Sequence, residues 1–75
     1  MDKKNIVVSI INDIREDKGE KSISDIDTNK DLRADLGLDS MDLAVLTARI
    51  EEEYGIDIFE DGIVATTAEI LKRLG

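Results

Sequence analysis

Apolar side chains recur at three- and four-residue intervals in three stretches of the chain, and this spacing indicates helices with one apolar face each. The first stretch covers residues 3–17, the second covers residues 40–54, and the third follows a capping box at residues 66–69. The three stripes consist of Ile6, Val7, Ile10, Ile11 and Ile14; of Leu43, Leu46, Thr47, Ile50 and Tyr54; and of Ile70, Leu71 and Leu74. The first stretch is rich in β-branched residues, so a strand competes there, but its length and polar continuation favour a helix.

The composition restricts how such helices can be held together. The chain has 75 residues and no cysteine, so neither disulfides nor thiolate metal sites can stabilise it. Glycine at positions 19 and 55 follows the first and second stretches and suits the end of a helix. We therefore predict one all-α domain over residues 1–75, a four-helix bundle with a long first loop and a short third helix near residues 59–64.

The first loop, residues 19–39, is long for so small a domain and needs apolar anchors to pack. Five residues are suitable: Ile23, Ile26, Leu32, Leu36 and Leu38. Asp25, Asp27 and Asn29 have the spacing of a calcium loop, but the glycine and glutamate positions of that motif are occupied by Lys30 and Leu36. We interpret this segment as a polar loop and predict no metal site.

Negative charge is concentrated in one part of the chain. The net charge is −8, and residues 35–63 alone hold nine acidic residues against a single base, Arg49. Phosphate-rich partners would be repelled there, which argues against nucleic acid and anionic membranes. The chain lacks a signal peptide and a transmembrane stretch, so we expect a cytoplasmic monomer whose partners are proteins with basic docking patches.

Ser40 stands where the second helix should begin, shortly after Gly37, which permits a tight bend. The free N–H groups and the dipole of a helix N-terminus favour a phosphate there. On spacing alone, a serine that only caps the helix is the simpler interpretation. A second feature of this helix points further: Met41, Val45, Ala48 and Glu52 lie opposite its core stripe, and three of these four are apolar or small. We interpret this row as a docking surface rather than chance.

Ser40 has no evident catalytic base. The chain contains no histidine and no cysteine, and no lysine is near Ser40 in the sequence. A serine nucleophile needs a base within hydrogen-bond reach, usually a histidine. Ser40 is therefore better interpreted as the substrate of another enzyme, and an enzyme is the least favoured function for this chain.

The stretch Asp35-Leu36-Gly37-Leu38-Asp39-Ser40-Met41 resembles the attachment motif of acyl carrier proteins, Leu-Gly-x-Asp-Ser-Leu. The resemblance extends to the length, the long first loop, the Glu51–Ile56 stretch and the Thr66-Thr67 helix start. It implies that a phosphopantetheinyl transferase moves 4′-phosphopantetheine from coenzyme A onto Ser40, making a phosphoprotein. It further implies a stand-alone acyl carrier, with acyl groups held as thioesters for fatty-acid, polyketide or specialised lipid biosynthesis.

The resemblance also implies two sets of site residues. The surface for acyl-loading and acyl-processing enzymes would consist of Asp39, Met41, Asp42, Val45, Glu51, Glu52, Glu60 and Asp61. A pocket for the acyl chain would be lined by Leu46, Ile50, Ile58, Ile63 and Ala68. Core packing alone explains the second set equally well.

Three positions depart from the family pattern and bear on the pathway. Val45 stands where housekeeping fatty-acid carriers usually have an acid, Arg49 adds a base one turn later, and Phe59 replaces a common proline. A carrier dedicated to a specialised pathway is therefore as plausible as the main fatty-acid carrier. A peptidyl or D-alanyl carrier and an unmodified acidic adaptor remain as alternatives, the first disfavoured by the acid around Ser40.

Overall fold

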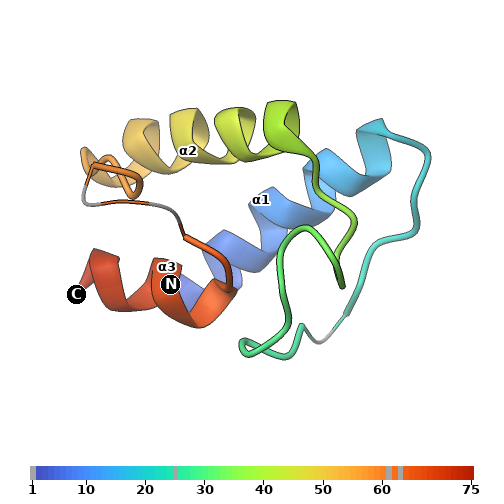
Figure 1. The fold of residues 1–75 in the computed structure, drawn as a ribbon, viewed down its shortest axis with the longest axis horizontal. Coiled ribbons are helices and arrows are strands. Elements are labelled where there is room, and N and C mark those ends of the chain that lie inside the picture. The colour runs from blue at the N-terminus through green and yellow to red at the C-terminus, as the bar shows by residue number, and fades with distance from the viewer. Residues whose placement is uncertain (1, 25, 61, 63) are drawn as a thin grey trace.

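A computed structural model describes residues 2–24, 26–60, 62 and 64–75 of the chain. In this part of the chain there are three α-helices and no β-strand: α1 (Lys3–Asp17), α2 (Ser40–Tyr54) and α3 (Thr67–Leu74). Figure 1 shows α1 crossing the middle of the molecule, with α2 on one side of it and α3 near its first residues. The predicted helical spans 3–17 and 40–54 are confirmed, and the strand alternative for the first is wrong.

The four-helix bundle is not confirmed. The expected short third helix falls in the connection between α2 and α3, where residues 58–60 form a turn held by hydrogen bonds from Glu60 N to Asp57 O and from Gly62 N to Phe59 O. Each of these bonds joins residues three positions apart, which is the spacing of a β-turn. Two residues of the expected helix, Asp61 and Ile63, lie outside the described residues, so a fourth helix stays a prediction.

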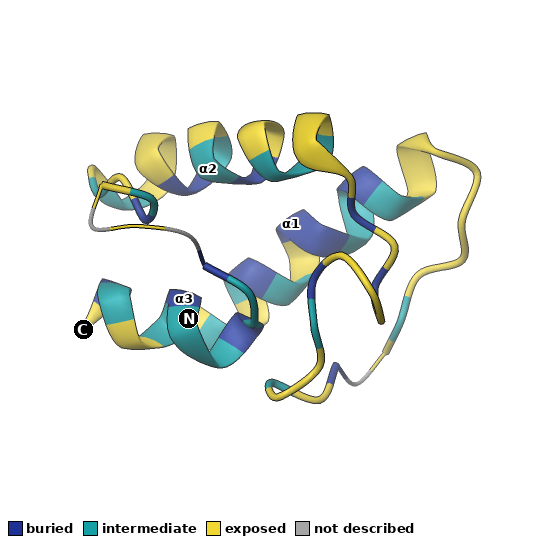
Figure 2. Cartoon of the chain, in the orientation of Figure 1, coloured by how far each residue is buried: buried dark blue, intermediate teal, exposed yellow. Residues whose placement is uncertain are grey.

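The core lies where the apolar stripes of the three helices meet. Leu46 and Ile50 of α2 and Ile11 of α1 are completely buried, as is Ile70 of α3. Figure 2 shows the buried side of α2 turned toward α1 and its exposed side turned away. Leu43 and Tyr54 are half-buried and pack against the same cluster, so the predicted inner stripe of α2 is confirmed.

The first loop packs as the sequence predicted. Ile26, Leu32, Leu36 and Leu38 are buried in the core cluster, and Ile23 packs against it. Asn12 of α1 holds the loop by two hydrogen bonds of 2.8 Å with the backbone of Ile23. These contacts let a long irregular segment pass over α1 and deliver the chain to the start of α2 with its backbone fixed.

The loop is also joined to the start of α3. Leu32 N donates to Ala65 O at 2.8 Å, Ala68 N donates to Thr28 O at 2.9 Å, and Asp31 and Thr66 form an isolated antiparallel bridge. Thr66 caps α3, because its hydroxyl accepts from Glu69 N at 3.3 Å. The predicted capping box is present in modified form, since the Glu69 carboxylate accepts from Ala65 N rather than from Thr66 N.

Glycines end the first two helices. After α1, Gly19 has φ of 82°, Gly19 N donates to Glu16 O, and Glu20 N donates to Arg15 O. This pair of bonds is a Schellman motif, which requires a left-handed residue at that position. Gly55 closes α2 with φ of 69°, and its N–H donates to Glu51 O at 2.7 Å. Both terminal positions agree with the sequence prediction.

Candidate functional site around Ser40

Ser40 is the first residue of α2 and is exposed to solvent. The residue that caps the helix is Asp39, whose carboxylate accepts from Asp42 N at 2.9 Å. The Asp42 carboxylate in turn accepts from Asp39 N at 3.0 Å, which completes a capping box. The interpretation of Ser40 as a plain capping serine is therefore wrong: two aspartates perform the capping, and the Ser40 hydroxyl is not needed for it.

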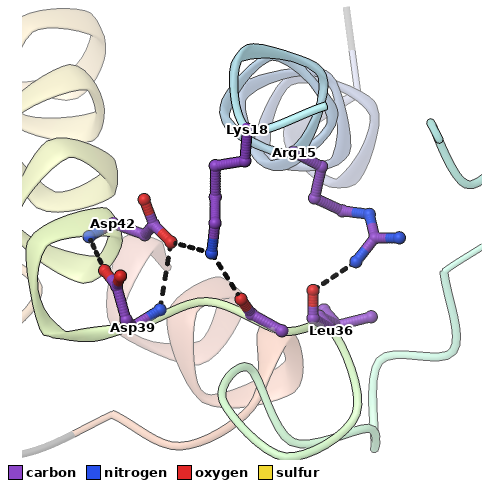
Figure 3. Close-up of polar contacts among 6 residues, drawn as sticks. Arg15, Lys18, Leu36, Asp39 and Asp42 are labelled. Atoms are coloured by element: carbon purple, nitrogen blue, oxygen red, sulfur yellow. Dashed lines mark hydrogen bonds and ion pairs between the residues drawn. The ribbon is translucent and has the colours of Figure 1, made fainter. Parts of the chain in front are cut away.

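Lys18, the residue that follows α1, joins this capping box to the loop before it. Its ammonium donates to Asp42 Oδ2 at 2.6 Å and to Gly37 O at 2.7 Å. Figure 3 shows the Lys18 side chain reaching from α1 to Asp42, and the Arg15 side chain lying beside it. Arg15 donates to Leu36 O, the carbonyl directly before Gly37. Two cations at the end of α1 therefore hold two successive carbonyls of the segment that leads to Ser40.

The contact between Lys18 and Asp42 stabilises the charged form of both groups. The hydrogen bond from Lys18 lowers the pKa of Asp42 below its ordinary value, with a further contribution from the backbone N–H of Asp39. The same hydrogen bond to Asp42 raises the pKa of Lys18. Lys18 lies close to Ser40 in space although not in sequence, but an ammonium with a raised pKa stays protonated at neutral pH. It therefore cannot serve as a base for the Ser40 hydroxyl.

The predicted partner residues divide between the two ends of α2. Asp39 and Asp42 flank Ser40 in the capping box, with Met41 79% exposed and Val45 46% exposed on the following turn. Glu51 and Glu52 are exposed near the end of the helix, and Glu60 is exposed in the turn beyond it. The row opposite the core stripe, Met41, Val45, Ala48 and Glu52, is exposed along its whole length. Asp61 lies outside the described residues.

Three of the five predicted pocket residues lie together in the core. Leu46, Ile50 and Ile58 are completely buried in one cluster, whereas Ala68 on α3 is half-buried and Ile63 lies outside the described residues. Burial of this kind is also what core packing alone requires, so the acyl pocket stays a prediction. Two surface grooves, of about 360 and 300 Å³, are lined by other residues.

The larger groove lies between α1 and α2, and Arg49 borders it. The Arg49 guanidinium donates to Asp13 Oδ2 of α1 at 3.1 Å, so this base is paired with a residue of the first helix. Sequence reasoning missed the contacts of Arg15 and Lys18 with the motif. The available signal was weak: two bases at the end of the helix that precedes an acid-rich segment.

None of the helices in the described ranges is long and apolar enough to cross a membrane. Comparison with known families gives a match over residues 7–74 to the family model described as a phosphopantetheine attachment site. Searches of curated proteins and of solved structures give no significant match. The family match covers nearly the whole chain, including all of α2 and the loop before it. The chain therefore belongs to the phosphopantetheine-attachment family: it is a carrier domain, and its covalent cofactor is 4′-phosphopantetheine.

Proposed function

We propose that the chain is an acyl carrier protein and that Ser40 is the residue that carries the phosphopantetheine. The observation that supports this most directly is the position of Ser40: it is the exposed first residue of α2, and Asp39 has taken over the capping. An enzyme can therefore reach the hydroxyl without unfolding the helix. The position also suits the phosphate of the phosphopantetheine arm, because the N–H groups and dipole of a helix N-terminus stabilise a phosphate.

The attachment reaction requires a separate transferase. The Ser40 oxygen attacks the phosphorus next to the pantetheine half of coenzyme A, a new O–P bond forms, and the diphosphate bridge breaks. The nucleotide half leaves with the bridging oxygen, and the serine proton passes to a base of the transferase. When bound, the arm supplies a terminal thiol that holds an acyl group as a thioester. The carrier itself contributes no catalytic group in this proposal, because Lys18 is held as an ammonium by Asp42.

The partner surface that we propose is the exposed side of α2. Met41 and Val45 provide apolar contact next to Ser40, with Glu51 and Glu52 further along the helix and Glu60 in the turn beyond it. The acids suit transferases and acyl-processing enzymes with basic docking patches. Arg49 does not reverse this charge, because it is bound to Asp13 on the side facing α1. Asp61 completes the proposed surface by sequence alone.

The experiment that tests the attachment site measures intact mass. Purified protein is incubated with a promiscuous phosphopantetheinyl transferase, magnesium and coenzyme A. We expect a gain of one phosphopantetheine in the wild type and in the matched control Ser9→Ala, since Ser9 is another exposed helical serine. We expect no gain in Ser40→Ala. A gain in Ser40→Ala would contradict the assignment, and no gain in the wild type under conditions that modify a control carrier would favour an unmodified adaptor.

The acyl role and the pocket are tested by loading octanoyl-phosphopantetheine from octanoyl coenzyme A. If the chain enters the core, the methyl resonances of Leu46, Ile50 and Ile58 should shift relative to the protein with the unloaded arm. The methyl resonance of Ala34, which is exposed in the first loop, serves as the internal control. Unchanged resonances at all three pocket residues would indicate an arm that stays in solvent and would favour a peptidyl or D-alanyl carrier. Val45, Arg49 and Phe59 suggest a specialised pathway. To test this, the acyl group must be identified on protein isolated from its host.

A further inference from the structure

We infer that Lys18 is a positioning residue for modification of Ser40: its ammonium fixes the backbone before Ser40 and the first turn of α2 as one unit. This inference rests on the proposed attachment at Ser40. Lys18 does not reach the hydroxyl itself. It acts through Gly37 O at 2.7 Å on one side of Ser40 and through Asp42 Oδ2 at 2.6 Å on the other.

The two acceptors of Lys18 lie on either side of Ser40, one in the bend before it and one in the first turn of α2. Gly37 has φ of 76° and is exposed, so the bend it makes is not held by packing of a side chain. Asp42 is part of the capping box, and its Oδ2 accepts from Asp39 N as well as from Lys18. One ammonium therefore joins the bend, the cap and the end of α1, as Figure 3 shows.

Arg15 provides a second, independent attachment. Its Nη1 donates to Leu36 O, and its Nε donates to Lys21 O at 3.1 Å, so it ties the beginning and the end of the first loop together. Leu36 and Leu38 are also buried in the core. The loop up to Leu36 thus stays in place without Lys18, and Leu38 is held as well, because its N–H donates to Leu32 O at 3.0 Å. What Lys18 adds is a direct link between the Gly37 carbonyl and the Asp42 carboxylate on either side of Ser40. Loss of Lys18 should therefore loosen Ser40 locally and leave the fold intact.

Charge gives Lys18 a second role at the same place. Ser40 lies between Asp39 and Asp42, and transfer of the arm brings a further negative group to its oxygen. The Lys18 ammonium lies against the Asp42 carboxylate and offsets its charge. Without it, an uncompensated carboxylate would face the incoming diphosphate of coenzyme A. If Lys18 is removed, the loss of positioning and the loss of charge compensation should both slow the transfer of the arm to Ser40.

The test compares Lys18→Met with Lys21→Met. Both variants lose one positive charge, and Lys21 is exposed in the first loop. Initial rates of phosphopantetheine transfer are measured by intact mass at several protein concentrations. We expect the kcat of Lys18→Met to fall about tenfold, since displacement of a reacting group by about 1 Å can cost about 100-fold and Arg15 limits the movement. The kcat of Lys21→Met should match the wild type.

The division between kcat and KM separates positioning from simple destabilisation. A variant that is merely less folded offers less substrate, which raises the apparent KM and leaves kcat unchanged. Lys18→Arg, which keeps the charge and the donors, should recover most of the lost kcat. Amide hydrogen exchange on the unmodified protein gives an independent readout: Asp39, whose N–H donates to the Asp42 carboxylate that Lys18 holds, should exchange faster in Lys18→Met, and Leu46 should not.

The inference and the proposed function fail in different ways. If the wild type gains no phosphopantetheine, the attachment at Ser40 is wrong and the role of Lys18 falls with it. If the wild type is modified and Lys18→Met shows the same kcat and the same exchange, only the role of Lys18 is overturned. A reduced kcat that Lys18→Arg does not recover would also overturn it.

Discussion

The two sides of α2 both carry apolar side chains, but only one of them is covered. On the inner side, Leu46 and Ile50 are completely buried against α1 and the rest of the core. On the outer side, Met41 and Val45 are 79% and 46% exposed. The difference shows that hydrophobicity alone does not separate residues that hold the fold from residues that meet partners. The position around the helix separates them.

The largest effect should come from truncating the inner side. We expect Leu46→Ala to reduce the free energy of unfolding by about 2–5 kcal/mol, because it leaves a cavity in a completely buried site. Val45→Ala, one residue earlier on the outer side, should change it by less than about 0.5 kcal/mol. Urea denaturation followed by circular dichroism measures both. Equal losses for the two variants would show that the outer side is also covered in solution.

A smaller effect should come from the helix start, which carries Ser40 between the two sides. Asp39→Ala removes the acceptor for Asp42 N, and we expect a loss of about 0.5–2 kcal/mol. Asp39→Asn is the matched control, because asparagine caps a helix as well as aspartate does. The same denaturation experiment applies. A loss in Asp39→Asn as large as in Asp39→Ala would mean that the charge, rather than the cap, stabilises α2.

The smallest effect should be the response to acid. The pKa of Asp42 is lowered in the folded protein by the hydrogen bond from Lys18, so its contribution to stability is present above the pKa of the unfolded chain, about 4. That contribution is lost as the pH falls through the lower, folded value. We expect the difference in Tm between the wild type and Asp42→Asn to narrow below about pH 4. A difference in Tm that stays constant between pH 7 and pH 3 would contradict the lowered pKa of Asp42.

The response to acid of a second aspartate, Asp31, distinguishes a pKa lowered by local hydrogen bonds from one lowered by a long-range contact. Hydrogen bonds from the backbone N–H groups of Ala34 and Arg33 lower the pKa of Asp31. These donors lie within three residues of Asp31, whereas Lys18 and Asp42 lie far apart in the chain. Loss of the Lys18 ammonium in Lys18→Met should therefore change the acid response of Asp42 and leave that of Asp31 unaltered.

Local patterns predicted most of the fold. The bounds of α1 and α2, the glycines that end them and the apolar anchors of the first loop all follow from spacing and turn chemistry. The identity of the cap did not follow, because Asp39 and Ser40 are adjacent and both residue types cap helices well. Spacing does not resolve which of two adjacent residues caps a helix. Yet the choice of Asp39 as the cap means that the Ser40 hydroxyl is not used by the cap.

The contacts of Arg15 and Lys18 could not be predicted for a different reason. They join the end of α1 to Leu36, Gly37 and Asp42, which follow it by 19 to 24 positions in the sequence. Whether such contacts form depends on the path of the first loop. Buried leucines in that loop fix the path, but the sequence does not state where each one packs. The match to the family of phosphopantetheine attachment sites identifies the cofactor, and likewise says nothing of these contacts.

Lys3 donates to the carbonyl oxygens of Leu74 and Gly75, so the start of α1 and the end of α3 lie together. In Figure 1 this junction is at the opposite end of α1 from the start of α2. Since α1 has 15 residues, the two places are separated by about 22 Å of helix. An affinity tag or fluorescent protein fused at either terminus would therefore be attached at the end of the molecule opposite Ser40. Immobilisation through such a fusion would leave Ser40 pointing away from the support and open to enzymes in solution.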